Sequence, residues 1–76
     1  MNIHVTLAGP LSKYGNGSRK QRVQAGQSWT LEDLLVALDI PEEKYSFVII
    51  NGQKSEKYNK LNDGDNVTIY PMVSGG

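Results

Sequence analysis

The residues that could do chemistry in this chain are few and lie far apart. His4 is the only histidine, and none of the 76 residues is a cysteine. A zinc site needs three or four protein ligands, and His4 has no second ligand at a useful spacing. Ser74 could act as a nucleophile only with His4 as its base, from the opposite end of the sequence. These residues predict neither a metal site nor an enzymatic nucleophile, and we expect His4 to be an exposed strand residue.

Two further segments contain residue types that occur in ligand-binding loops. Asp63-Gly64-Asp65 places two carboxylates close together, but the glutamate that closes a calcium-binding EF-hand loop is missing. The segment 9–20 (GPLSKYGNGSRK) combines glycines with lysine but does not have the spacing of a phosphate-binding loop. We therefore expect a tight turn at the first segment and a surface loop at 8–19.

The last six residues, PMVSGG, could form an arm that an enzyme modifies. Pro71 is expected to end strand pairing, so that 71–76 leave the domain as a flexible, uncharged arm. Gly75 and Gly76 have no Cβ and let the backbone approach another molecule closely. A carboxylate at Gly76 would become reactive if an enzyme coupled it to a nucleotide phosphate as a mixed anhydride. The alternative is a frayed end without a function, and the residues alone leave both interpretations open.

The elements that must position this arm can be predicted from periodicity. A helix is expected at 30–41, with Thr30 as N-cap, Asp33 in the capping-box position and Pro41 as its stop. Its apolar stripe consists of Leu31, Leu34, Leu35 and Leu38. Strands are expected at 2–7, 20–25 and 66–70, with a hairpin at 46–54 that turns at Asn51-Gly52.

One helix with one apolar stripe needs one sheet face to cover it. The order β-β-α-β-β therefore predicts an α+β protein of the β-grasp (ubiquitin-like) type, with a mixed sheet of four to five strands over one main helix. The domain is expected to span 1–70. Besides the leucine stripe, its core is expected to contain Ile3, Val5, Leu7, Val67 and Ile69.

Composition limits the classes of partner. The chain has 8 basic and 8 acidic residues, which gives no general electrostatic reason to bind nucleic acid or a membrane. The absence of cysteine and of an apparent signal peptide favours a cytoplasmic protein. We expect a monomer when the protein is free.

The closing stretch LNDGDNVTIYPMVSGG resembles the sulfur-carrier family that includes the small subunit of molybdopterin synthase and the sulfur carrier of thiazole synthesis (MoaD/ThiS). The central stretch IPEEKYSFVIINGQ is similar to the hairpin of the same family. The resemblance implies that Gly76, after Gly75, is adenylated and converted to a thiocarboxylate. The matching positions are Leu61, Asp63, Gly64, Asp65, Pro71, Val73, Gly75 and Gly76.

The resemblance also implies partners. An E1-like adenylating enzyme would use ATP, and a large synthase subunit or another acceptor enzyme would take the sulfur, with no cofactor held tightly by this chain. The spacing of Pro71 and Val73 is closer to the molybdopterin synthase subunit than to the thiazole carrier. Sulfur delivery to thiazole, tRNA or amino-acid synthesis remains open. So does a ubiquitin-like modifier or interaction module, although the arginine that precedes the glycines of ubiquitin is missing.

A flexible arm offers few contacts, so the folded domain is expected to bind the partner as well. The run Phe47-Val48-Ile49-Ile50 is apolar on both sides of its strand, and one of the two pairs must face outward. A resemblance to the hairpin of ubiquitin indicates Phe47 and Ile49; the alternative is that the extra pair packs under the 8–19 loop. The expected docking residues are Phe47, Ile49, Tyr70, Pro71, Met72, Val73 and Ser74.

Overall fold

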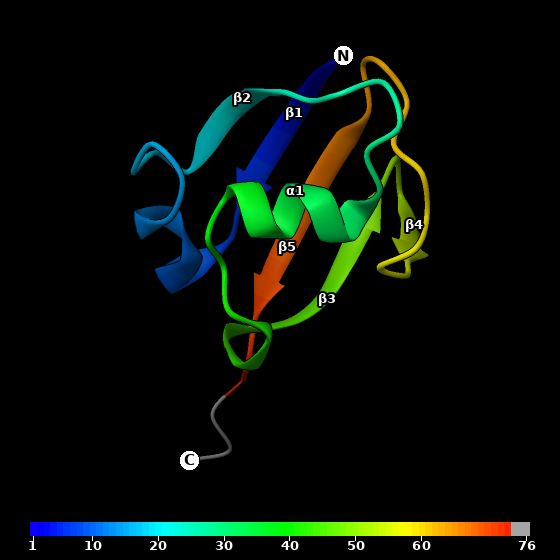
Figure 1. Cartoon of the computed structure of the whole chain (residues 1–76). Helices are drawn as coiled ribbons and strands as arrows, with labels where there is room; N and C mark the ends of the chain where they lie inside the picture. The colour runs from blue at the N-terminus through cyan, green and yellow to red at the C-terminus, as the bar shows by residue number, and fades with distance from the viewer. Residues whose placement is uncertain (74–76) are drawn as a thin grey trace.

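The structure is a computed structural model that describes residues 1–73, and over these residues it forms one five-stranded sheet crossed by a single α-helix (Figure 1). Ser74, Gly75 and Gly76 lie outside the described residues. The strands are β1 (Asn2–Leu7), β2 (Lys20–Gln24), β3 (Tyr45–Ile50), β4 (Gln53–Ser55) and β5 (Asn66–Pro71). The helices are α1 (Leu31–Ala37) and two short 3₁₀ helices, η1 (Gly9–Lys13) and η2 (Glu42–Lys44).

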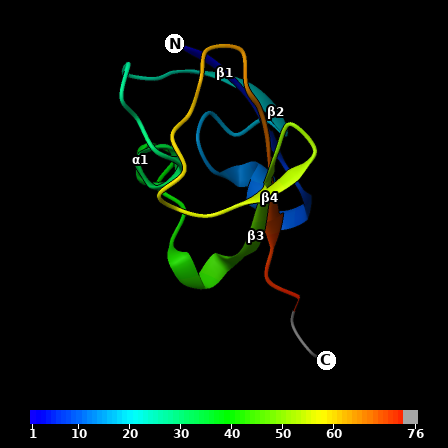
Figure 2. The ribbon, with the colours of Figure 1, turned by 90° about the vertical axis from the view of Figure 1, so that its right-hand side faces the viewer.

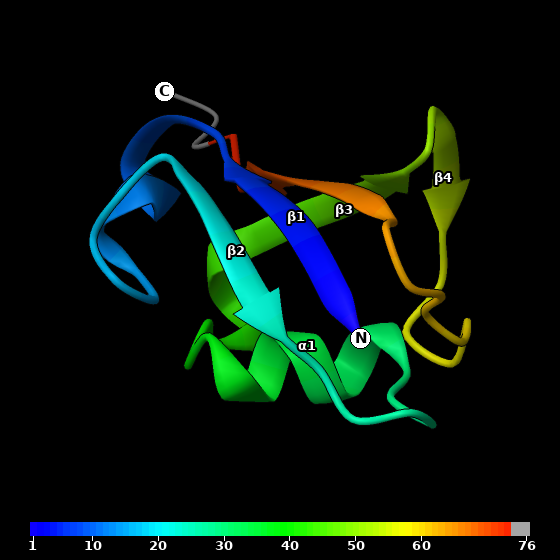
Figure 3. The same cartoon turned by 90° about the horizontal axis from the view of Figure 1, so that it is seen from above.

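The strand order in the sheet is β2-β1-β5-β3-β4, so the last strand of the sequence lies in the centre. The central pair β1 and β5 is parallel, and the other three pairs are antiparallel. Figure 3 shows α1 crossing one face of the sheet, with β2 and β4 at opposite edges. The predicted β-grasp fold with a mixed sheet is therefore confirmed.

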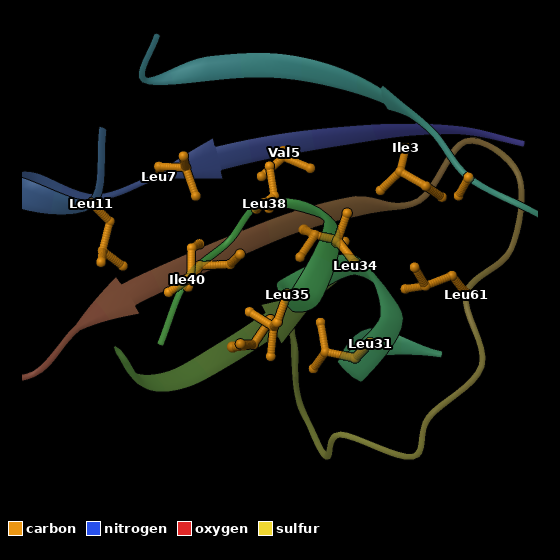
Figure 4. Close-up of a cluster of buried hydrophobic side chains, with 14 residues drawn as sticks. Ile3, Val5, Leu7, Leu11, Leu31, Leu34, Leu35, Leu38, Ile40 and Leu61 are labelled. Carbon is orange, nitrogen blue, oxygen red and sulfur yellow. The ribbon is translucent and has the colours of Figure 1, made fainter. Parts of the chain in front are cut away.

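The hydrophobic core lies between α1 and the inner face of the sheet (Figure 4). All nine predicted core residues are buried, and Leu34 and Ile69 have no exposed surface at all. The other buried apolar residues, which periodicity did not assign, are Leu11, Ala25, Ile40, Val48 and Leu61. Along β1 and β5 the residues between the core positions face the other side of the sheet, which no helix covers among the described residues.

The helix begins as predicted and ends earlier than predicted. Thr30 and Asp33 form a reciprocal capping box, in which each side chain accepts a hydrogen bond from the other's backbone N–H. The helix ends at Ala37, not near Pro41, because Asp39 adopts a left-handed conformation with φ of 60°. The N–H of Ile40 then donates to the carbonyl of Leu35 at 3.1 Å, which is the hydrogen bond of a Schellman motif.

The hairpin between β3 and β4 turns where predicted. Asn51 and Gly52 both have positive φ, 50° and 84°, as a two-residue type I′ turn requires. The predicted tight turn at 63–65 is also present, with Gly64 at φ of 86°. The hairpin turn fixes the register of β3 against β4 and therefore the side from which each of their side chains emerges.

The expected surface loop at 8–19 is only partly a loop. Residues Gly9–Lys13 form η1, and its Leu11 is buried against the core. Pro10 favours this turn because its ring fixes φ near the helical value at the start of a helix. A single buried leucine gives no periodicity, so the sequence pattern alone could not indicate the element.

Figure 2 shows the helix α1 on one side of the sheet and the chain leaving β5 at the end opposite the N-terminus.

The prediction that Pro71 ends strand pairing was wrong. Pro71 is the last residue of β5 and pairs with Tyr45 of β3. The register shifts between Tyr45 and Phe47, which leaves Ser46 as an extra, bulged residue. A bulge accommodates a proline in a strand because no N–H is needed at that point. Pairing then continues for one hydrogen bond, from Met72 N–H to the carbonyl of Lys44 at 3.0 Å.

Candidate partner-binding site

An exposed apolar patch lies on the outer face of the sheet, where β5 ends. We call the four residues Phe47, Ile49, Tyr70 and Met72 the apolar patch. Phe47 and Tyr70 are direct cross-strand neighbours, and their rings stack with centroids 4.7 Å apart and an angle of 17° between planes. Phe47 is 38% exposed, Tyr70 36% and Met72 54%. Large apolar side chains at this exposure, gathered at one place, are typical of interaction surfaces.

The burial of β3 decides which of its apolar residues face outward. Val48 is only 1% exposed and lies in the core, so its neighbour Phe47 emerges on the outer face. Ile49 pairs with Thr68, and both are half-buried on the same outer side. Ile50 packs against the core. The orientation expected from the resemblance is therefore observed. Within the 8–19 stretch, Gly9–Lys13 packs against β1 and β5.

The segment that leaves the sheet is held by three contacts at its root. The Ser46 hydroxyl donates to the carbonyl of Pro71 at 3.0 Å, and Met72 N–H donates to Lys44. On the other side η1 packs against β5. Beyond these contacts Val73 is 86% exposed. The chain thus leaves the domain directly beside the apolar patch.

A groove of about 260 Å³ runs along this root between η1 and η2. Two lysines stand at its sides: Lys13, whose Nζ lies 5.6 Å from the centroid of the Tyr14 ring, and Lys44. The lining residues are Pro10, Leu11, Lys13, Tyr14, Glu43, Lys44, Pro71 and Met72. The groove is open and mixed in polarity, and it can accept contacts from a partner on both sides of the emerging chain.

Two ionisable side chains near the patch have raised pKa values. Burial raises the pKa of Tyr45, with a smaller opposing effect of Lys57 and further increases from Glu42 and Glu32. Lys57 donates a hydrogen bond to Glu42, and this bond raises the pKa of the lysine. Tyr45 is therefore protonated and Lys57 charged at neutral pH, and neither has the near-neutral pKa that a general acid or base needs.

The other candidate residues lie where the sequence analysis expected them. His4 is exposed on the outer face, opposite Arg22 of β2 and Asn66 of β5. Asp63 and Asp65 belong to a turn. Within residues 1–73 there is no group of three or more His, Cys, Asp or Glu that could hold a metal ion, and no helix long and apolar enough to cross a membrane. Ser74 lies outside the described residues.

Asp65 is only 6% exposed and has a structural role that the sequence pattern did not predict. Its carboxylate accepts hydrogen bonds from Asn51 Nδ2 at 2.8 Å and from the backbone N–H of Asn62 at 2.7 Å. This network joins the hairpin turn to the loop before β5. The sequence did contain a signal. Asn51 lies in a predicted turn, and Asp65 comes directly before β5, the strand that pairs with β3. Spacing alone could not show that the two meet.

Comparison with known proteins identifies the family. The sequence profile of the Mut7-C ubiquitin family matches residues 1–75. The chain belongs to the Mut7-C ubiquitin family. No curated protein matches it. The predicted likeness to ubiquitin-like proteins is thereby confirmed, with a family name that the sequence had not indicated.

Solved structures share the fold at low sequence identity. SAMP1 from Haloferax volcanii is 23% identical, with 100% of both chains covered and a TM-score of 0.76. A chain of the complex of subunits 1 and 2 of the molybdopterin-converting factor from Helicobacter pylori is 24% identical, with 100% of both chains covered and a TM-score of 0.66. A chain of the BexX/CysO complex from Amycolatopsis orientalis is 22% identical, with 97% of this chain and 99% of that one covered and a TM-score of 0.68. At these identities the likeness establishes the ubiquitin-like fold.

Proposed function

We propose that this protein is a sulfur carrier whose Gly76 carboxylate is activated by a partner enzyme. The partner joins the carboxylate to the α-phosphate of ATP and releases pyrophosphate, which gives an acyl adenylate. Sulfide then attacks the acyl carbon: a C–S bond forms, the bond to the phosphate oxygen breaks, and AMP leaves with that oxygen. A proton is released and no electrons are exchanged. The product is a thiocarboxylate, which can donate its sulfur to an acceptor.

The observation that carries this proposal is the position of the apolar patch at the root of the C-terminal segment. Ordering a residue's backbone costs about 1–2 kcal/mol, so threading the residues after Met72 into an enzyme costs several kcal/mol. A docking surface next to that segment can offset this cost. Phe47, Tyr70 and Met72 supply such a surface without any catalytic group of their own. This arrangement suits a substrate-like carrier that an enzyme binds by its body and modifies at its end.

For the pathway we propose molybdopterin synthesis. Two observations support it: the placement of Pro71 and Val73 before Gly75-Gly76, and the fold shared with a chain of the Helicobacter pylori molybdopterin-converting factor complex. In that pathway the acceptor is a large synthase subunit, which would bind the same patch as the adenylating enzyme after it. Because the two partners use one surface, they should compete for the protein.

The test is the intact mass of the chain after incubation with the adenylating enzyme of the same organism, ATP and inorganic sulfide. We expect a mass gain equal to the exchange of one oxygen for one sulfur. Deleting Gly75-Gly76 should abolish the gain, while the melting temperature stays nearly unchanged because exposed terminal residues contribute little stability.

Three outcomes would contradict the proposal in different ways. Sulfur uptake by the truncated chain would show that the carboxylate of Gly76 is not the acceptor. Attachment of the chain to other proteins through isopeptide bonds, without sulfur uptake, would identify a modifier. If the loaded chain transfers no sulfur to a large molybdopterin synthase subunit, the pathway is wrong although the carrier chemistry stands.

A further inference from the structure

Among residues 1–73, the strands of this chain contain no acidic residue, although the charges of the whole chain sum to zero. The strands instead contain the basic residues Lys20, Arg22 and Lys54. All 8 acidic residues lie on α1, on η2 and in turns and loops: Glu32, Asp33, Asp39, Glu42, Glu43, Glu56, Asp63 and Asp65.

The strand register places the basic residues on the same face as the apolar patch. Lys20 lies opposite Thr6 and Arg22 opposite His4, and both β1 residues alternate with core positions. Directly opposite residues share a face, so Lys20 and Arg22 point outward. A shallow hollow of about 390 Å³ is lined by these side chains together with Asn66 of β5. We call Lys20, Arg22 and His4 the cationic strip.

A further cation stands at the opposite edge of the sheet. Lys54 of β4 lies opposite Ile49, which is on the outer face. One row therefore crosses the whole sheet from a lysine on β2 to a lysine on β4, with half-buried, uncharged side chains between them. Its members are Lys20, Thr6, Thr68, Ile49 and Lys54. Figure 3 shows β2 and β4 at the two edges that this row joins.

We propose that the outer face of the sheet docks a partner protein whose surface is acidic around an apolar recess. The apolar patch would fill the recess, and the cationic strip and Lys54 would face carboxylates at its rim. This rests on the proposed function, whose docking surface it specifies. Cations that flank an apolar centre match the usual anatomy of an interface, with an apolar core and a charged rim. Glu32 and Asp33, on α1 at the other face of the sheet, would point away from the partner.

Basic sheets with exposed aromatic rings also bind nucleic acids, but this face is built differently. Sheet-based nucleic-acid modules offer open ring faces on which bases stack. Here Phe47 and Tyr70 stack on each other, so one face of each ring is already covered. Phe47 as a whole residue is 38% exposed. An acidic protein surface is therefore the occupant that fits both the charges and the rings.

Rim charges act mainly on the association rate, and salt screens them. The test is the association rate constant between this protein and its adenylating enzyme, measured by stopped flow at several ionic strengths. The variant K20E/R22E should associate about tenfold more slowly at low salt, within the range of electrostatic steering, and its dissociation rate should change little. Its rate should also depend less on salt than the wild-type rate.

The matched control compares R22E with K60E, which change the net charge equally; Lys60 pairs with Thr30 beside the start of α1. Equal slowing in both variants would show an effect of net charge and overturn the proposal. So would an unchanged rate and salt dependence in K20E/R22E. The charge-neutralising variant K20Q/R22Q should show about half of the effect on a logarithmic scale, and it keeps the test valid if the reversed charges disturb folding.

A second measurement separates this inference from the proposed function. The isotopically labelled chain is titrated with poly-L-glutamate and, separately, with a single-stranded oligothymidylate, and amide shifts are followed by NMR. We expect poly-L-glutamate to shift amides of β2, β1 and β4, and this result needs no adenylating enzyme. Stronger shifts with the oligonucleotide, or shifts confined to other surfaces, would overturn the acidic-protein proposal. If the chain takes up sulfur in the mass test but fails here, the carrier function stands and the docking chemistry is wrong.

Discussion

The two ends of β5 are built in opposite ways. At its start, polar groups are closely satisfied: Asp65 is buried and hydrogen bonded, and Asn66 exchanges hydrogen bonds with Asn51 at 2.8 and 2.9 Å. At its end, the strand passes a bulge and leaves the domain beside the exposed apolar patch. We call the hydrogen-bonded group of Asp65, Asn51 and Asn66 the polar clamp. The strand thus begins in this clamp and ends at a surface with exposed apolar side chains. The hydrogen bonds at the start of β5 stabilise the fold, whereas the exposed side chains at its end are available to bind a partner.

The clamp also secures the N-terminus of β1. Asp63 Oδ1 accepts from the backbone N–H of Asn2 at 2.6 Å, and Gly64 N–H donates to the carbonyl of Asn2 at 2.8 Å. The parallel pair β1 and β5 is therefore aligned at one end by side chains and turns. Parallel strands have no hairpin to set their register, so such contacts matter for this pair. At the other end, where the chain must be threaded into an enzyme, comparable side-chain contacts are few.

The largest effect is expected from breaking the clamp. Asp65→Ala removes the acceptor of Asn51 Nδ2 and of the Asn62 N–H in a buried place. The loss of two hydrogen bonds to a buried carboxylate should lower the free energy of unfolding by about 3 kcal/mol. The measurement is urea denaturation followed by circular dichroism. The control is Asp63→Ala, whose hydrogen bond is exposed and should cost about 1 kcal/mol. Equal losses in both variants would mean that burial is not what makes Asp65 important.

A smaller effect, on binding and not on stability, is expected at the other end. Phe47→Asp places a charge in the centre of the apolar patch and should weaken binding to the adenylating enzyme by about 2 kcal/mol, the scale of an interface hot spot. Titration calorimetry measures this change. Val36→Asp is the control, since Val36 is 72% exposed on α1, away from the sheet's outer face. If Val36→Asp weakens binding as much as Phe47→Asp, the docking surface is on the helix side.

The inner face of the sheet could be predicted from sequence because periodicity determines it. The leucine stripe of α1 and the alternation of β1 and β5 each have one apolar side, and burial follows directly. The clamp could not be predicted, because Asn51 and Asp65 meet only after the register of β3 and β5 is set. Neither could the end of α1, since the left-handed Asp39 gives no signal as clear as a glycine would.

In the candidate site, too, some features follow from periodicity and others only from the register of the strands. The pairing of Phe47 with Tyr70 follows from the register of two strands, whereas alternation left two choices for β3. The cationic strip was not predicted, for another reason: a net charge of zero over the whole chain does not show that the charged residues of the strands are all basic. Pro71 was misjudged because a bulge at Ser46, which depends on the partner strand, lets the ladder include it.

The smallest expected effect sharpens the comparison at the end of β5 itself. The Ser46 hydroxyl donates to the carbonyl of Pro71 at 3.0 Å, and Ser46 is exposed. Water can replace this bond, so Ser46→Ala should lower the free energy of unfolding by about 0.5 kcal/mol, near the low end for a hydrogen bond. Urea denaturation alongside Asp65→Ala measures both ends of the strand in one assay. A loss as large as that of Asp65→Ala would show that the exit of the chain is clamped as firmly as its entry. The segment after Pro71 would then have to be released before an enzyme could thread it, and the contrast between the two ends would no longer hold.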